Sequence, residues 1–198
     1  MTTAEDAELA AELGADYLGL NFYEESPRFV RVERAREIAA AVAGDVTLVG
    51  VFVNAIPTTV AAIAEDVGLE LLQFHGDEGT SELEPFAGRA IKVLRLDVAP
   101  DSSLLDRWPG IWGFLIEGRH PTLYGGSGQG WAYEMIGDLP RGRRIFAAGG
   151  LTPANVGDAV RRSRAWGVDV CSGVEASPGI KDRKLLEMFF DEVRRGEE

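Results

Sequence analysis

The sequence has 198 residues, of which 45% are hydrophobic and 26% are charged, and its net charge is −12 at pH 7. This negative charge argues against nucleic acid or an anionic membrane as a partner, because both repel it. The single cysteine, Cys171, excludes an internal disulfide and a cysteine-based zinc cluster. No apolar run approaches the roughly 18 residues of a membrane span, and the polar, acidic start is unlike a signal peptide, so we expect a cytoplasmic protein.

Helices and strands are predicted to alternate along the chain. The first helix covers residues 4–13 and stops at Gly14, and the apolar run at residues 47–53 is typical of a strand covered on both faces. In all, strands are predicted at residues 17–22, 47–53, 69–74, 90–95, 111–116, 144–148 and 168–171. Helices are predicted at residues 4–13, 32–43, 58–67, 81–86, 131–136 and 182–195 and between residues 156 and 168, with an irregular or one-turn link at residues 101–107.

The alternation predicts a parallel sheet with helical crossovers. We expect a single domain over residues 1–198, because no linker or low-complexity segment divides the chain. The count is seven strands and about eight helices, and a helix comes first. Two α/β architectures fit that count: an open doubly wound sheet, and a barrel that lacks its first strand.

Two predicted strand ends near the C-terminus carry small residues that suit a phosphate. Gly149 and Gly150 follow one strand, and Ser172 and Gly173 follow the next. Without a Cβ the backbone can approach a ligand closely, and a helix that begins after such a turn offers free N–H groups and a partial positive charge. Two such turns on the last two strands of a barrel form a phosphate site. A purely structural role for the turns is the alternative.

Further polar side chains stand at predicted strand ends, where parallel sheets carry their ligand sites. Arg28 follows the first strand, and its guanidinium could pair with a carboxylate through two hydrogen bonds. His75 follows another strand, and Arg95 ends a third. Asp169 lies within the last strand, where a charge needs a partner, so we expect it to have a role at the barrel mouth. A solvated arginine and a structural histidine are the plain alternatives. The glycine-rich segment at residues 125–128 could wrap a ligand or move as a lid.

The position of Cys171 beside Ser172 could suggest a nucleophile. No histidine stands near it in the sequence, however, and we expect a small buried thiol. No spacing of His, Asp and Glu residues indicates a metal site.

Seven ordered motifs of this chain are similar to those of one enzyme family. They include Gln-Phe-His-Gly-Asp-Glu at residues 73–78, Ala-Gly-Gly-Leu-Thr-Pro-Ala-Asn-Val at residues 148–156, and Val-Asp-Val-Cys-Ser-Gly-Val-Glu at residues 168–175. The motif at residues 168–175 continues at residues 177–182, and the other matching segments lie at residues 3–7 with 14–16, 26–28, 49–54 and 125–128. In these motifs the chain resembles phosphoribosylanthranilate isomerase, of tryptophan biosynthesis, over nearly its whole length.

The resemblance implies a (β/α)8 TIM barrel, here without its first strand, and an Amadori rearrangement of N-(5-phosphoribosyl)anthranilate. In that reaction a general acid opens the aminoaldose ring and a general base removes the C2 proton, with no metal or organic cofactor. The expected partner is a phosphorylated small molecule, bound by a monomer or homodimer. The implied phosphate-binding residues are Gly126, Gly149, Gly150, Ser172 and Gly173, and the other implied substrate-binding residues are Arg28 (at the anthranilate part), His75 and Asp169.

Two catalytic positions of the family differ in this chain. The family base is a cysteine in a Lys-x-Cys-Gly element of the first strand, and Met1 aligns just after that element. Cys171, which stands where the family usually has a serine, does not replace it. The family acid is an aspartate, and the aligned position holds Ala132. A start codon assigned too late would explain the absent strand. An upstream sequence without an in-frame Lys-x-Cys-Gly segment would contradict that hypothesis.

Removing one acid or base typically lowers a rate by about 10²–10⁴-fold. Two alternatives to the isomerase therefore stay open at this point. One is a non-catalytic barrel relative that binds a phosphorylated ligand or a partner protein. The other is a different sugar-phosphate isomerase or synthase on the same scaffold, because a fold does not fix its chemistry.

Overall fold

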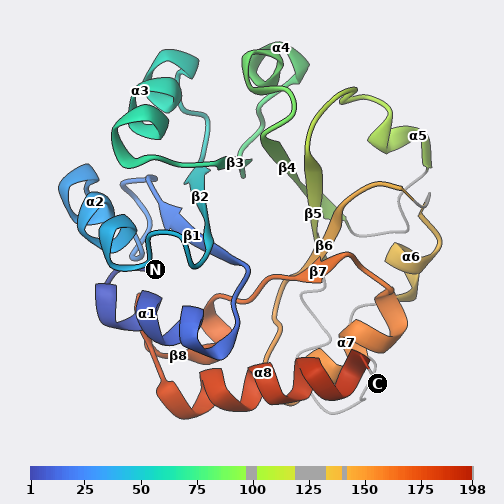
Figure 1. Ribbon diagram of the computed structural model, residues 1–198. Coiled ribbons are helices and arrows are strands. Elements are labelled where there is room, and N and C mark those ends of the chain that lie inside the picture. The colour runs from blue at the N-terminus through green and yellow to red at the C-terminus, as the bar shows by residue number, and fades with distance from the viewer. Residues whose placement is uncertain (97–101, 119–132, 140–141, 198) are drawn as a thin grey trace.

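The computed structural model describes residues 1–96, 102–118, 133–139 and 142–197. Seven parallel strands form its main sheet and neighbour one another in sequence order, from β1 to β7. The sheet curls into an incomplete barrel with the helices outside it (Figure 1). The prediction of a barrel without its first strand is confirmed. The doubly wound alternative is wrong, because such a sheet reverses its strand order part-way and this one does not.

The strands are short and largely buried, and β3 and β6 are buried at all four of their positions. Their bounds are β1 (Tyr17–Asn21), β2 (Thr47–Phe52), β3 (Leu71–Phe74), β4 (Ala90–Leu96), β5 (Gly113–Gly118), β6 (Ile145–Ala148) and β7 (Gly167–Val168).

Local signals set the helix ends. The Thr3 hydroxyl accepts a hydrogen bond from the Asp6 N–H at 3.1 Å and so caps α1, which stops at Gly14 with φ +101°. The helices are α1 (Ala4–Leu13), α2 (Val32–Ala41), α3 (Pro57–Val67), α4 (Thr80–Leu83) with the 3₁₀ turn η1 (Glu84–Phe86), α5 (Ser102–Leu105), α6 (Glu134–Gly137), α7 (Val156–Ser163) and α8 (Arg183–Glu197). None of the helices in the described ranges is long and apolar enough to cross a membrane.

Side chains alternate between the two faces of the strands, and each face has its own core. The outward face packs against the helices, and Leu20, Phe52 and Phe74 belong to that larger cluster. The inward face fills the barrel interior, and Val49 and Leu115 belong to this smaller cluster. Both sides of the sheet are therefore apolar, as the continuous hydrophobic run of β2 predicts.

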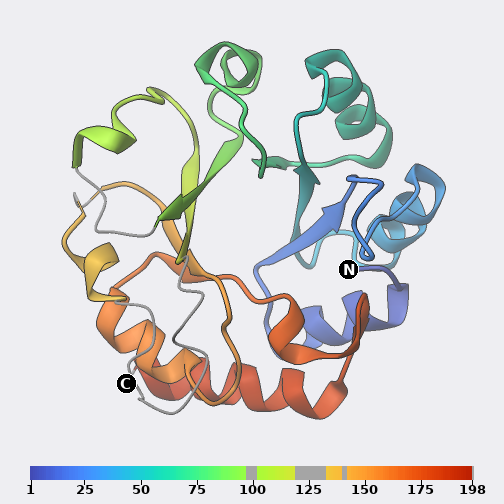
Figure 2. The same cartoon turned by 180° about the vertical axis from the view of Figure 1, so that it is seen from behind.

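The sheet is open between β1 and β7. Among the strands in the described part of the chain, β1 pairs only with β2, and β7 pairs only with β6; β1 also makes one isolated bridge, from Asn21 to Phe29. The ring of helices nevertheless closes outside this gap, because α8 packs against both α7 and α1 (Figures 1 and 2). The helix ring is thus complete where the sheet is not.

A cavity of about 780 Å³ occupies the gap between β1 and β7. Inward-facing side chains of the sheet, such as Gln73 and Leu115, line it on one side. Leu13 of α1 and Phe189 of α8 line it on the other side. Its size is within the usual range of small-molecule sites, about 300–1,000 Å³.

Four aromatic side chains lie together at the N-terminal end of the strands. Tyr17, Trp112, Phe146 and Trp166 have ring centroids 5.3–6.1 Å apart in every pair. Tyr17 is in β1 and Trp166 directly precedes β7, so side-chain packing joins the two strands that no backbone ladder connects.

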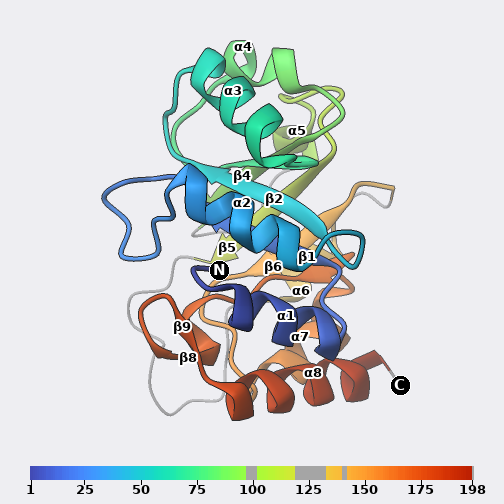
Figure 3. The same ribbon diagram turned by 60° about the vertical axis from the view of Figure 1, so that its left-hand side comes forward.

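The end of the main sheet differs from the prediction. Strand β7 covers only two residues, and an unpredicted antiparallel hairpin of β8 (Glu175–Ser177) and β9 (Ile180–Lys181) precedes α8. The Lys181 N–H donates to Asp6 Oδ2 at 3.0 Å, and the Thr2 hydroxyl donates to the Gly179 carbonyl. The hairpin therefore docks beside the start of α1 (Figure 3), an interaction between sequence ends that no local pattern reveals.

Candidate active site

The two glycine turns predicted from the sequence lie at the C-terminal ends of β6 and β7. Gly149 and Gly150 are exposed and have φ of +91° and +67°, a backbone conformation that other residues rarely adopt. Asn155 fixes this turn: its Oδ1 accepts from the Thr152 N–H at 2.7 Å, and its Nδ2 donates to the Gly150 carbonyl at 3.0 Å. Helix α7 begins at the next residue, so its N-terminus faces the turn.

The second turn packs directly against the first. A Cβ added to Gly173 would lie 1.8 Å from the carbonyl oxygen of Leu151, which leaves glycine as the only residue that fits. Ser172 and Gly173 belong to the 3₁₀ turn η2 (Ser172–Val174). The expectation that a full helix follows this turn directly is wrong, because the β8–β9 hairpin stands between η2 and α8.

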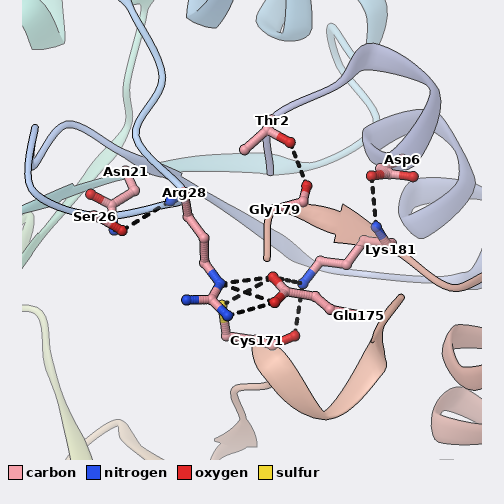
Figure 4. A network of polar contacts seen from close by, with 9 residues as sticks. All are labelled: Thr2, Asp6, Asn21, Ser26, Arg28, Cys171, Glu175, Gly179 and Lys181. Atoms are coloured by element: carbon pink, nitrogen blue, oxygen red, sulfur yellow. Dashed lines mark hydrogen bonds and ion pairs between the residues drawn. The ribbon is translucent and has the colours of Figure 1, made fainter. Parts of the chain in front are cut away.

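Arg28 makes a two-pronged ion pair with Glu175 (Figure 4). Nε donates to Oε1 at 2.8 Å, and Nη2 donates to Oε2 at 2.5 Å. Lys181 Nζ adds a second cation 3.4 Å from Oε1. Burial alone would raise the pKa of Glu175, but the hydrogen bonds from Arg28 and the charge of Lys181 outweigh it, so this pKa is lowered and the carboxylate stays ionised.

His75 is held between two side chains at the ends of β3 and β5. Its Nδ1 lies 3.1 Å from Gln73 Oε1, and its Nε2 lies 3.3 Å from Glu117 Oε2. Arg95 Nε donates to the same Glu117 oxygen at 3.3 Å. Burial would raise the pKa of Glu117, but His75 and Arg95 outweigh that effect, so its pKa is lowered. The predicted strand-end residues His75 and Arg95 thus meet through a carboxylate that the sequence reasoning missed.

A buried ion pair supports the loop that carries His75. Lys92 is 4% exposed, and its Nζ donates to Glu78 Oε2 at 2.8 Å and to the Gly76 carbonyl at 2.7 Å. Glu78 Oε1 accepts from the Asn54 N–H at 2.7 Å. The loops after β2 and β3 are therefore joined through one carboxylate beneath the site.

Asp169 directly follows β7, where its side chain borders the cavity. Its carboxyl group makes no hydrogen bond or ion pair to any residue that the structure describes, so the expected partner is not among those residues. The cavity provides the physical reason, since the side chain is exposed to solvent there although protein surrounds it.

Cys171 is exposed, so the prediction of a buried thiol is wrong. Its Sγ lies 3.7 Å from Glu175 Oε1. The surrounding protein desolvates the thiol and raises its pKa, so it stays protonated at neutral pH and is a poor nucleophile.

Two predicted positions, Gly126 and Ala132, lie outside the described residues. The structure brings together the other predicted residues Arg28, His75, Gly149, Gly150, Asp169, Ser172 and Gly173 at the C-terminal ends of the strands. The sequence reasoning did not identify Glu117, Glu175 and Lys181, although Glu175 and Lys181 are within motifs that it singled out.

Among the residues that the structure describes, no group of three or more His, Cys, Asp or Glu side chains could hold a metal ion.

Comparison with known proteins identifies the family. A family model of N-(5'-phosphoribosyl)anthranilate isomerase matches residues 1–192. The chain belongs to this family. The isomerase of Pseudomonas fluorescens is 43% identical over 197 residues, which cover 98% of this chain and 95% of that protein.

Solved structures of the isomerase family have the same fold. Monomers generated from the dimeric Thermotoga maritima isomerase match with a TM-score of 0.83 and 30% identity, over 98% of this chain and 95% of that one. An isomerase in complex with reduced 1-(o-carboxyphenylamino)-1-deoxyribulose 5-phosphate matches with a TM-score of 0.84 and 31% identity, over the same shares of the two chains.

Proposed function

We propose that this protein catalyses the Amadori rearrangement of N-(5'-phosphoribosyl)anthranilate to 1-(2-carboxyphenylamino)-1-deoxyribulose 5-phosphate, in tryptophan biosynthesis. The observation that carries the proposal is the contact between two glycine turns beside a cavity, at the edge of the sheet where barrels bind their substrates. Membership of the isomerase family over residues 1–192 supports the same reaction.

The substrate of this reaction has an anion at each end, a phosphate and a carboxylate. In our proposal the backbone N–H groups of the two turns hold the phosphate, helped by the N-terminus of α7. The residues assigned to that role are Gly126, Gly149, Gly150, Ser172 and Gly173.

Arg28 is assigned to the anthranilate end of the substrate. Its Nε and Nη2 are engaged by Glu175, while its Nη1 makes no hydrogen bond to a residue that the structure describes. A guanidinium fixed on one side in this way can offer its remaining N–H groups to a substrate carboxylate at little entropic cost. His75 and Asp169 are assigned to the sugar between the two anions.

We further propose that the protein acts in the cytoplasm as a monomer or homodimer on this phosphorylated small molecule. The relative with a bound product analogue supports a ligand of this class. The dimeric Thermotoga maritima relative supports assembly as a dimer.

Growth of a tryptophan auxotroph that lacks the isomerase tests the function. Three genes are compared: the chain as given, the chain with its upstream in-frame codons, and an Ala132→Asp variant. Growth with the chain as given supports the isomerase directly, and growth only with the upstream codons supports a late start codon. Growth only with Ala132→Asp would show that the acid was lost. No growth in any case would overturn the proposal in favour of a binding role.

A further inference from the structure

The backbone of Asp169 is held by the sheet, whereas its carboxyl group has no hydrogen-bond or ion-pair partner among the described residues. Its N–H donates to the Ala147 carbonyl at 2.9 Å and so continues the β6–β7 ladder one residue beyond β7. Its side chain lines the cavity of about 780 Å³ together with those of Gln73 and Lys181. No hydrogen bond or ion pair to the described residues holds the carboxyl group, so none of these residues competes with a ligand for it.

The three carboxyl groups of the site fall into two classes. Glu117 and Glu175 are each paired with cations, and both have lowered pKa values. Desolvation by the surrounding protein and the negative charge of Glu117 instead raise the pKa of Asp169, against the opposing charges of His75, Lys181 and the N-terminal amine of Met1. Neighbouring carboxyls that protonate at different pH values commonly divide into an acid and an ionised partner.

The alternatives for proton donation among the described residues are weaker. Glu117 and Glu175 are ionised and accept hydrogen bonds from cations, and the Cys171 thiol, with its raised pKa, is a weak acid. Lys181 Nζ donates to the Cys171 carbonyl at 2.9 Å and to Glu175. Of the three carboxyl groups at this end of the strands, Asp169 is thus the one that has no hydrogen-bond or ion-pair partner among the described residues.

We propose that Asp169 is the general acid that opens the sugar ring of the substrate. This inference rests on the proposed function and assigns its first proton transfer. The Asp169 carboxyl proton passes to the ring oxygen as the bond between that oxygen and C1 breaks, and the bonding pair stays on the oxygen. The nitrogen lone pair forms the C=N bond to C1, which yields a protonated imine and the Asp169 carboxylate.

The surroundings of Asp169 favour its return to the acid form. Its new carboxylate repels Glu117, which raises the affinity of Asp169 for a proton. Solvent reaches the side chain through the cavity and can supply that proton. The site is therefore reset without a further protein group.

Steady-state kinetics of an Asp169→Asn variant test the assignment. The amide keeps the shape of the side chain but has no acidic proton, so kcat should fall about 10²–10⁴-fold. The amide can still form a hydrogen bond with the sugar, so calorimetry with the reduced product analogue should show a far smaller change in Kd than in kcat, which separates proton transfer from binding. Asp191→Asn, on the exposed face of α8, is the matched control and should keep wild-type kinetics.

The pH profile supplies a readout that a structural role would not move. A general acid must be protonated, so kcat/KM should fall as the pH rises through the pKa of Asp169. Glu117→Gln leaves the desolvation of Asp169 in place but removes the negative charge that adds to it, so the alkaline limb should shift to lower pH. Carboxyl NMR titration should show a pKa of Asp169 above its ordinary value of 3.8, and a lower one in the Glu117→Gln variant.

The outcomes separate the two proposals. Absence of turnover in every version of the chain, including the one with upstream codons and the Ala132→Asp variant, overturns the proposed function and the acid assignment with it. Three results would overturn only the assignment of Asp169 as the acid. They are turnover that survives Asp169→Asn, a loss of kcat/KM that a higher Kd alone explains, and an ordinary pKa at Asp169. A large rise in kcat for Ala132→Asp would also overturn it, because a site that already holds its acid gains little from another.

Discussion

Arg28 and Glu175 are 147 residues apart in the sequence and form a two-pronged ion pair, with Nη2 2.5 Å from Oε2 and Nε 2.8 Å from Oε1. Arg28 is in the segment after β1, and Glu175 begins β8, shortly after β7. The pair therefore joins the two edges of the open sheet at their C-terminal ends. At the N-terminal ends, Tyr17 and Trp166 make the corresponding connection through their rings, 5.8 Å apart.

Glu175→Gln should destabilise the fold by about 2 kcal/mol. The Glu175 side chain is 5% exposed, and its loss of charge leaves two cations, Arg28 and Lys181, without their counter-ion. Breaking a fully buried pair costs about 3–5 kcal/mol, and the 26% exposure of the Arg28 side chain reduces that figure. Urea unfolding measures the change.

The control for this variant is Glu187→Gln on α8. Glu187 has an arginine partner at 3.5 Å with both side chains well exposed. Its loss should change the free energy of unfolding by less than about 0.5 kcal/mol. Equal effects of the two variants would contradict a stabilising role for the Arg28–Glu175 pair.

The same pair predicts a pH dependence of stability. The folded pKa of Glu175 lies below its ordinary value of 4.5, so its contribution is fully present above that pH and is lost as the pH falls through the folded pKa. Stability should therefore decline below about pH 4.5 more steeply in the wild type than in Glu175→Gln. Glu117, whose pKa is also lowered, maintains part of the slope in the variant. Parallel curves for the two proteins would contradict the prediction.

Lys92→Met should cost about 3–5 kcal/mol of stability. The substitution keeps the apolar stem but leaves the Glu78 carboxylate buried without its cation. Thermal or urea unfolding measures it, and Arg36→Met is the control, because the Arg36–Asp66 pair is exposed and should contribute less than about 1 kcal/mol. A loss for Lys92→Met as small as the control would show that water reaches Glu78.

The sequence predicts what local signals encode. Alternating helices and strands, with polar or glycine residues at the strand ends, are sufficient for the barrel and for placing His75 and Gly149 at one edge. Pairings across the barrel are not encoded locally. Glu117 meets His75 only through the registers of β3, β4 and β5, and Glu175 meets Arg28 only after the whole sheet has curled. Asp169 borders a cavity and has no partner in the described part of the chain, and a sequence pattern does not reveal that cavity.

Gly173→Ala should weaken binding of the reduced product analogue. The added Cβ would lie 1.8 Å from the Leu151 carbonyl oxygen, so the two glycine turns must move apart. Backbone N–H groups that hold a phosphate depend on exact spacing for their hydrogen bonds. Calorimetry should show at least a tenfold rise in Kd, equivalent to about 1.4 kcal/mol.

Gly79→Ala is the control for that substitution. Its Cβ would meet only Glu82 Oε2 at 3.1 Å, the end of an exposed and flexible side chain. Its Kd should equal that of the wild type. An unchanged Kd for Gly173→Ala would contradict the assignment of the two turns to the phosphate.

Trp166→Ala should destabilise the protein by about 2–3 kcal/mol although the side chain is 49% exposed. The indole contacts Tyr17, Trp112 and Phe146, and Arg144 stacks over it with its guanidinium carbon 5.9 Å from the ring centroid. Its removal would open the contact between the unpaired edges of β1 and β7, which backbone hydrogen bonds do not hold.

Met188→Ala is the matched control for Trp166→Ala. Met188 is 54% exposed on α8, far from the open edge in sequence, and should change stability by less than about 0.5 kcal/mol. Hydrogen exchange should also quicken at the β1 and β7 amides in Trp166→Ala but not in the control, because local opening precedes exchange there. If both variants lost the same stability, or if exchange quickened uniformly over the sheet, the aromatic cluster would not be what keeps these two edges together.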